Sequence, residues 1–137
     1  MRVVEADIGH LWQHLEAKRC ATSAHEYGLL VGEVLARRAY AGLVGEHPVA
    51  LGGVLDAADG GPGYAWLSVL PGSLEKRLVV AVRHIRRTMA AVAASHPAGI
   101  ACAVDDDNGA GQRLALALRF NPGHGAIGML RSWHWHG

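Results

Sequence analysis

The chain has 137 residues, of which 50% are hydrophobic, and its formal net charge is +1 at pH 7. This length fits one domain with a single core, which we expect to span residues 1–137. No apolar run approaches the ~18 residues of a membrane helix, and the near-neutral charge predicts no strong attraction to nucleic acid or anionic membranes. The first residues carry no signal-peptide pattern, so we expect a cytoplasmic protein. Two widely spaced cysteines, Cys20 and Cys102, favour reduced, buried thiols over a disulfide.

The first 35 residues indicate a short strand and two helices. Residues 2–6 form the strand candidate, and Asp7 is a suitable N-cap for a helix that extends to about Arg19. Ser23 precedes a second helix, in which apolar residues recur three and four positions apart. The buried stripes that we expect are Leu11, Trp12 and Leu15 on the first helix and Tyr27, Leu30, Val31, Val34 and Leu35 on the second. The glutamates outside these stripes, which we expect in solvent, are Glu16, Glu26 and Glu33.

From residue 39 the apolar pattern becomes that of strands. Residues 40–44 and 49–55 are separated by a hairpin-type turn, and residues 64–70 follow a second turn at 59–63. Three consecutive strands joined by short turns predict an antiparallel meander. Gly52 and Gly53, inside the second of these strands, suggest a bulge or a close approach of backbone.

Pro71-Gly72-Ser73 ends the third strand and leads into the longest predicted helix, residues 74–95. A strand at 99–104 follows it, and the order strand, helix, strand implies a parallel pair with a right-handed crossover. The stretch 126–136 alternates and predicts one last strand. On the long helix, the expected buried face is Leu74, Leu78, Val82, Ile85, Met89 and Val92, and the expected basic face is Lys76, Arg83, Arg86 and Arg87.

The run Asp105-Asp106-Asp107-Asn108 separates the strand at 99–104 from residues rich in helix formers, which end before Pro122. Acidic side chains complement the positive end of a helix, and Asn is a good N-cap. The spacing of a calcium loop is missing, so we interpret this run as a capping turn rather than a Mg²⁺ or Ca²⁺ site. His134 and His136 would share one face of a strand, but two ligands do not make a metal site. We expect no bound metal.

This order of elements resembles the GNAT acyltransferase superfamily over essentially the whole chain. In that family a strand is followed by Asn, a small residue three positions later, Leu at six, Tyr at seven and Gly-Phe at eleven and twelve. Here those places hold Asn108, Gly111, Leu114, Ala115 and Arg119-Phe120. The resemblance implies an α+β (α/β) fold with a mixed sheet. Its order would be strand, two helices, three strands, helix, strand, helix and strand, with an antiparallel meander and one parallel pair.

The resemblance also implies an acetyl-coenzyme A site. GNAT enzymes bind the pantetheine arm where the fourth strand diverges from the fifth, and they bind the pyrophosphate with a Gln/Arg-x-x-Gly-x-Gly/Ala loop at a helix start, where free N–H groups suit anions. The residues that it assigns to the cofactor are Val69, Leu70, Gly72, Ser73, Leu74, Asn108 and Gln112. The loop pattern itself is absent from residues 71–76, and Lys76 and Arg77 are the cations that could partly compensate.

The sequence alone assigns no catalytic residue. Ala115 stands where the family commonly has a Tyr that protonates the departing thiolate, a task that Ala cannot perform. The alternatives for a general base are Glu46, His47 and Asp56, each of which equally suits a turn or a surface. Ser68 on the fourth strand is a candidate for contact with substrate, or a packed hydroxyl.

Two classes of function stay open. The first is an N-acyltransferase that moves an acyl group from acyl-coenzyme A to a small amine by direct attack, with backbone amides near Val69 and Leu70 polarising the thioester. The second is a binding or structural protein with the same fold, because fold alone does not decide function.

The second class is suggested by a resemblance to short GNAT-like proteins of tailed phages, some of them internal virion proteins. The shared features are a basic helix, here Arg83-His84-Ile85-Arg86-Arg87, a proline before the fifth strand, here His96-Pro97, and a Val-Asp-x-x-Asn turn. This resemblance implies a protein partner or a virion component, in the host cytoplasm or the particle. Trp133 and Trp135 in an apolar last strand are typical of a core or an interface and leave a homo-oligomer open.

Overall fold

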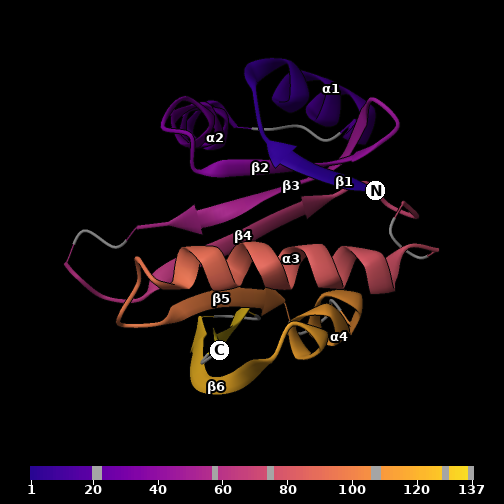
Figure 1. Ribbon diagram of the computed structural model, residues 1–137. Helices are drawn as coiled ribbons and strands as arrows, with labels where there is room; N and C mark the ends of the chain where they lie inside the picture. The colour runs from indigo at the N-terminus through magenta and orange to yellow at the C-terminus, as the bar shows by residue number, and fades with distance from the viewer. Residues whose placement is uncertain (20–22, 57–58, 74–75, 106–108, 128–129, 136–137) are drawn as a thin grey trace. The chain divides into compact units, whose positions relative to one another are not determined.

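The computed structural model describes all residues except 20–22, 57–58, 74–75, 106–108, 128–129 and 136–137 (Figure 1). Its elements are β1 (Arg2–Glu5), α1 (Ile8–Lys18), α2 (Ala24–Leu35), β2 (Ala39–Val44), β3 (His47–Leu55), β4 (Gly63–Val69), α3 (Leu78–Ala93), β5 (Ile100–Asp105), α4 (Gly109–Ala117), β6 (Phe120–Ile127) and β7 (Leu130–Trp135). The strands form a seven-stranded mixed sheet in the hydrogen-bonded order β1-β2-β3-β4-β5-β7-β6. The predicted α+β class is confirmed, and so is the predicted order of elements as far as α4.

The chain divides into two compact units. The first comprises Met1–Leu55 and Trp66–Ala81, and the second comprises Asp56–Ala65 and Val82–Gly137. The first unit therefore contains β1, β2, β3, α1 and α2, and the second contains β5, β6, β7 and α4, while β4 and α3 contribute residues to both. A single domain over residues 1–137 stays a prediction.

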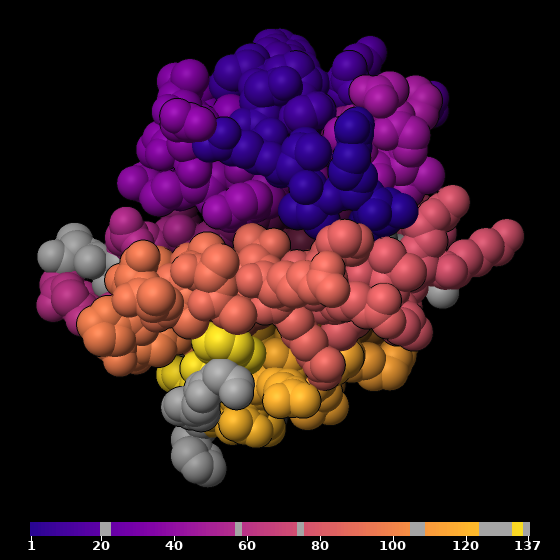
Figure 2. Space-filling model, in the orientation of Figure 1, coloured from indigo at the N-terminus to yellow at the C-terminus, as the bar shows by residue number. Residues whose placement is uncertain are grey.

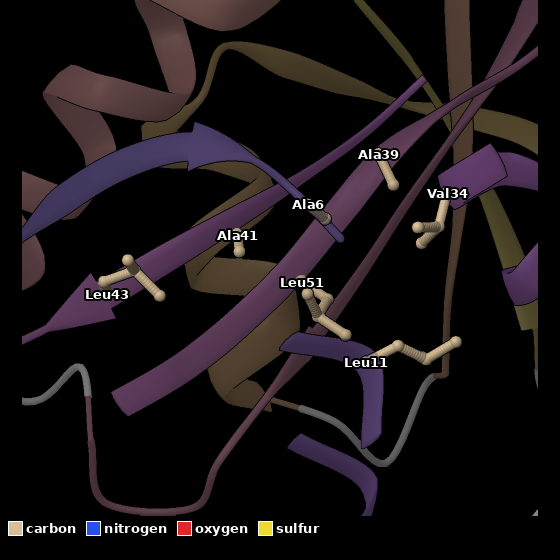
Figure 3. Close-up of a cluster of buried hydrophobic side chains, with 7 residues drawn as sticks. All are labelled: Ala6, Leu11, Val34, Ala39, Ala41, Leu43 and Leu51. Carbon is tan, nitrogen blue, oxygen red and sulfur yellow. The ribbon is translucent and has the colours of Figure 1, made fainter. Parts of the chain in front are cut away.

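An apolar core holds the helices of the first unit against its strands. Leu11 of α1 is fully buried, and Leu51 of β3 is 2% exposed. Figure 3 shows the side chains of the cluster, which are Ala6, Leu11, Val34, Ala39, Ala41, Leu43 and Leu51. Burial of a large apolar side chain stabilises the fold by about 1.5–3 kcal/mol. This core fixes α1 over the strands, which matters for the polar side chains that α1 carries.

Both helices of the first unit begin at the predicted caps. The Asp7 carboxylate accepts a hydrogen bond from the His10 N–H at 2.8 Å, and the Asp7 N–H donates to His10 Nδ1 at 3.1 Å. Such a reciprocal cap satisfies two helix-end N–H groups at once. Ser23 Oγ accepts a hydrogen bond from the Glu26 N–H at 3.1 Å. The two N-caps are therefore confirmed.

Some residues of the predicted buried stripes on these helices are buried, and others are exposed. Val34 is buried as expected, but Trp12 and Leu35 are 58% and 69% exposed. Trp12 instead packs edge-to-face on Tyr27, with ring centroids 5.9 Å apart. The buried face of α1 is therefore narrower than predicted. Trp12 is next to Leu11 in sequence, so its side chain lies to one side of the Leu11 face and packs against α2.

Glu33, which we expected in solvent, is buried. Its two carboxylate oxygens accept hydrogen bonds from Arg38 at 2.7 and 2.9 Å, and 7% of the residue is exposed. The bidentate pairing offsets the cost of removing the carboxylate from water. Arg38 lies between the end of α2 and the start of β2, so the helical pattern alone does not indicate the pair.

The predicted meander is confirmed. β2 and β3 pair antiparallel. β3 and β4 also run in opposite directions, because the Val49 carbonyl near the start of β3 accepts from the Leu70 N–H at 2.9 Å, whereas Gly53 near its end lies against Trp66.

The close backbone approach predicted at Gly52 and Gly53 is confirmed as well. A Cβ atom at Gly53 would lie 2.6 Å from the Arg38 backbone oxygen and 3.1 Å from Trp66 Nε1. A Cβ atom at Gly52 would lie 2.9 Å from the Trp66 backbone oxygen. Real Cβ atoms do not approach backbone oxygen this closely, so both positions require glycine.

In the second unit, the predicted parallel pair is confirmed. Gly63 and Tyr64 of β4 lie opposite Ile100 and Ala101 of β5, and the Gly63 N–H donates to the Gly99 carbonyl at 3.0 Å. β5 pairs antiparallel with β7 over its whole length.

The single last strand predicted over residues 126–136 is wrong. The structure has two strands there, β6 and β7, which pair antiparallel. The sequence pattern treats Pro122 as the end of a helix, yet it lies inside β6 at the edge of the sheet. An edge strand tolerates proline because one side of it needs no N–H donor. The register of the pair shifts between Pro122 and Ala126.

α3 begins at Leu78, later than the predicted start at residue 74, and Leu74 itself lies outside the described residues. Atoms of α3 lie along the face that Figure 2 presents. Met89 is 6% exposed, as the predicted buried face requires, but Leu78 is 46% exposed. Of the predicted basic face, Arg83, Arg86 and Arg87 are exposed on α3, whereas Lys76 is exposed but precedes the helix. No helix in the described part of the chain is long and apolar enough to cross a membrane.

Candidate functional site

The predicted cofactor residues begin at the carboxyl end of β4. Val69 is the last residue of this strand and Leu70 follows it, and both are half-buried. The Leu70 N–H donates to the Val49 carbonyl of β3 at 2.9 Å. This amide already has a partner within the sheet, so it is not free to donate to a thioester carbonyl.

Backbone alternation turns the Val69 amide the other way. Neighbouring residues of a strand direct their N–H and C=O groups to opposite edges. Since the Leu70 N–H faces β3, the N–H and C=O of Val69 face the opposite edge of β4. Gly63 has the same parity, and its N–H donates away from β3, to Gly99. Within the described residues, the parallel register with β5 contains Gly63 and Tyr64.

The loop after β4 is held by its own hydrogen bonds. The Leu70 carbonyl accepts from the Ser73 N–H at 3.2 Å and from Ser73 Oγ at 2.6 Å. Gly72 has a φ of +78°, a left-handed conformation that favours glycine. Arg77 Nη1 donates to the Ser73 carbonyl at 3.4 Å. Local bonds therefore hold Leu70, Ser73 and Arg77 together, and the Ser73 amide already has a partner.

The remaining predicted cofactor residues belong to α4 or precede it. Gln112 is half-buried and has an interaction partner. Asn108 and the acidic run before it from residue 106 lie outside the described residues, so the predicted N-cap stays a prediction. Ala115, at the place of the family's tyrosine, is 5% exposed. A methyl group buried there offers no proton donor.

A polar cluster within the first unit joins α1 to β4. Ser68 Oγ lies 2.9 Å from His14 Nε2 and accepts a hydrogen bond from Lys18 Nζ at 2.9 Å. His14 is fully buried, and its Nδ1 has no partner of ordinary hydrogen-bond geometry among the described residues. We name Ser68, His14 and Lys18 the serine cluster.

The charge state of the serine cluster follows from burial. Burial lowers the pKa of His14 below its usual 6.5, and the Lys18 charge acts in the same direction. The Pro48 backbone carbonyl lies near enough to the ring to oppose part of that fall. The imidazole is therefore neutral at pH 7, the form that accepts a proton.

Sequence reasoning missed two members of this cluster. It weighed Ser68 as a substrate contact but not His14 or Lys18. The available signal is position, because His14 follows Leu11 by three residues and therefore shares its buried face. The partner in β4 lies 54 residues further along the chain, and no local pattern indicates that contact.

In the second unit, the surroundings of another histidine, His96, favour its charged form. His96 Nδ1 lies 3.1 Å from the Val92 carbonyl, and Nε2 lies 2.6 Å from Asp56 Oδ1. The Val92 carbonyl, with the Asp56 carboxylate, raises the pKa of His96 above 6.5 against the opposing effect of burial. Asp56, one of the alternatives for a general base, is thus occupied as a counter-ion.

The other weighed residues lie at the surface. Glu46 is exposed and pairs with Arg2 at 3.3 Å, and His47 is exposed too.

Burial raises the pKa of the free Cys102 thiol to about 11, so the thiol stays protonated, while Cys20 lies outside the described residues. Among described residues, no three His, Cys, Asp or Glu side chains gather closely enough to hold a metal ion.

The chain has the fold of the GNAT acetyltransferases. The GNAT domain of S. lividans PAT matches it with a TM-score of 0.75 at 12% identity, over 98% of this chain and 89% of that one. An acetyltransferase from Agrobacterium tumefaciens gives 0.73 at 12% identity, over 98% and 90%. Aminoglycoside 6'-N-acetyltransferase from Acinetobacter haemolyticus gives 0.66 at 18%, over 93% and 95%. No family model and no curated protein matches the sequence.

Proposed function

We propose that the chain is an acyl-coenzyme A-dependent N-acyltransferase in which a small amine attacks the thioester directly. The observation that carries this proposal is the direction of the Val69 backbone, whose N–H and C=O face the edge of β4 opposite β3. The solved acetyltransferases with the same fold support the class of chemistry. Fold alone would not be sufficient, because one fold hosts many functions.

The Val69 amide suits either of two tasks. It can pair with an amide of the pantetheine arm as a strand would, or it can donate to the thioester carbonyl. A fixed backbone donor stabilises the charge that develops on that oxygen, and loss of one such donor lowers kcat by roughly 10²–10³-fold. Leu70 cannot share the task, since its N–H bonds to Val49.

The pyrophosphate would be bound by charge rather than by a glycine-rich loop. The Ser73 amide is occupied by the Leu70 carbonyl, whereas Lys76 and Arg77 are exposed just before α3 begins. The partial positive charge of a helix N-terminus adds to theirs. Exposed charges are screened by salt, so this arrangement predicts salt-sensitive binding.

A second candidate is a binding or structural protein that has this fold without the transfer reaction, with a phage particle as one setting. Ala115 favours it, because a buried methyl group cannot protonate a thiolate. The first turn of α3 favours it too, since Leu78, Val79 and Val80 are 46%, 73% and 40% exposed. An apolar turn of this kind suits contact with a protein partner or a second copy of the chain.

Calorimetric titration with acetyl-coenzyme A and its desulfo analogue tests the proposal. We expect micromolar binding that weakens as salt is raised. Replacing Arg77 by alanine should weaken binding about tenfold, or ~1.4 kcal/mol, whereas Arg87→Ala on the exposed face of α3 serves as the matched control and should leave it unchanged. No heat at millimolar ligand contradicts the proposal. A symmetric oligomer in sedimentation would then favour the second candidate.

A further inference from the structure

We propose that Ser68 is a nucleophile, activated by His14 and Lys18, which attacks activated esters and thioesters and carries their acyl group as a covalent serine ester. The proposal goes beyond transfer from coenzyme A and does not require that cofactor to bind. It stands on the two 2.9 Å contacts of Ser68 Oγ, one to a base and one to a cation.

Hydrogen-bond chemistry fixes the direction of the Lys18 contact, and the tautomer of His14 sets that of the other. An ammonium group only donates, so Ser68 Oγ is the acceptor of the bond from Lys18. The hydroxyl has one proton of its own to give. In the tautomer that carries the imidazole proton on Nδ1, Nε2 of His14 presents a lone pair to that hydroxyl. The bonds then run in one direction, from Lys18 to Ser68 to His14.

Burial gives the base its position and its charge state. His14 is fully buried, and its neighbours along α1 belong to the apolar core, so the ring is held in place. Its lowered pKa keeps it neutral at pH 7. A neutral imidazole in hydrogen-bond contact with a hydroxyl is the arrangement that activates serine nucleophiles. Ser68 itself is only half-buried, and the proposal requires that a small electrophile reach its hydroxyl.

Acylation and deacylation balance without a further reactant besides water. Ser68 Oγ forms a bond to the carbonyl carbon, the bond from that carbon to the leaving oxygen or sulfur breaks, and the serine proton passes through His14 Nε2 to the leaving group. Water then attacks the serine ester, and its proton returns through His14 to Oγ. The Lys18 ammonium stabilises negative charge on oxygen in both steps. The net reaction is hydrolysis of the ester.

A purely structural role for the cluster makes different predictions. A hydroxyl that only fills a buried hydrogen-bond network does not react with electrophiles faster than other serines. An activated one reacts selectively with alkyl fluorophosphonates, which phosphonylate nucleophilic serine with loss of fluoride. This probe reports on the hydroxyl itself and does not depend on any natural substrate.

The test is the reaction of the full chain with a fluorophosphonate, followed by intact mass and peptide mapping. We expect one adduct per chain, mapped to Ser68, and no adduct in Ser68→Ala. The matched control is Ser95→Ala, which removes an exposed serine outside the cluster and should react as the parent does. Hydrolysis of p-nitrophenyl acetate should show the same dependence on Ser68.

Two further measurements separate activation from folding. Lys18→Met changes a half-exposed side chain and should slow labelling about tenfold or more while the unfolding midpoint barely moves. The labelling rate of the parent should rise with pH and level off below pH 6.5, as deprotonation of a His14 with a lowered pKa requires. Absence of an adduct on the folded parent overturns the proposal, and so does equal labelling of Ser68→Ala. Failure of acetyl-coenzyme A to bind leaves these outcomes unaffected.

Discussion

Substitution of Gly53 by alanine tests the packing of β3 against β4 and against Arg38, the residue before β2. The added Cβ atom would lie 2.6 Å from the Arg38 backbone oxygen and 3.1 Å from Trp66 Nε1. The nearer atom is backbone and cannot turn aside, so the strands themselves must shift. Overpacking of this kind typically costs 1–3 kcal/mol, and we expect a loss of about 3 kcal/mol. For a chain of this size, that loss lowers Tm by roughly 10 °C.

Gly28 supplies a matched control with the opposite sign. It lies inside α2, is exposed, and a Cβ atom there would meet nothing within 4 Å. Alanine lowers the backbone entropy of the unfolded chain and favours helix, so Gly28→Ala should stabilise the protein by about 0.5–1 kcal/mol. The same chemical change thus has opposite effects at the two sites.

Urea denaturation followed by circular dichroism gives both free energies of unfolding. We expect the two variants to differ by roughly 3.5–4 kcal/mol, the sum of the two effects above. If Gly53→Ala unfolds at the same urea concentration as the parent, the close approach of Gly53 to Arg38 and Trp66 is wrong.

Three further predictions concern ionised groups. Because the pKa of His96 is raised, its contact with Asp56 contributes stability that is fully present below pH 6.5 and is lost as the pH rises through the folded pKa. In urea titrations, the stability advantage of the parent over His96→Gln should therefore shrink above pH 6.5. The lowered pKa of His14 has the opposite sign, with stability present above pH 6.5 and lost as the pH falls through the folded pKa, so His14→Gln should flatten the acid side of the stability profile. Replacing Glu33 by glutamine should destabilise the chain by about 1–3 kcal/mol, because it removes the carboxylate that pairs with Arg38. A change below about 0.5 kcal/mol would mean that the Glu33–Arg38 pair contributes no more than an ordinary surface ion pair.

The parts of the fold that depend on local sequence could be predicted. The caps at Asp7 and Ser23 follow from side chains that bond to backbone three residues away. The glycine pair in β3 indicates a close approach of backbone even though the sequence does not identify the approaching residue. The parallel pair of β4 and β5 follows from element order and handedness alone. In each case the cause lies within a short stretch or in a general rule of chain topology.

The parts of the fold that depend on residues distant in sequence could not be predicted. Glu33 looks like a solvated helix residue until Arg38 is seen to pair with it. Pro122 ends helices in general, and only the position of β6 at the sheet edge explains why it also fits a strand. Trp12 shows the converse, an apolar side chain that packs on a neighbouring helix and stays exposed.

In the candidate site, too, the sequence predicted local features but not contacts between residues distant in sequence. Val69 and Leu70 were assigned together from the family pattern, and only the hydrogen bond from Leu70 to Val49 separates their roles. Ser68 could be weighed from its place in the fourth strand, but the base and the cation beside it come from α1. A side chain's partners across 50 or more residues are a property of the fold rather than of any stretch of sequence.

The central claim is that the amide edge of β4 at Val69 receives the acyl donor. Titration of ¹⁵N-labelled protein with acetyl-coenzyme A, followed by amide resonances, tests it most directly. We expect the Val69 N–H signal to shift and to become protected from hydrogen exchange, while the Leu70 N–H, already bonded to Val49, keeps its protection throughout. Unchanged Val69 signals at millimolar ligand would contradict the claim.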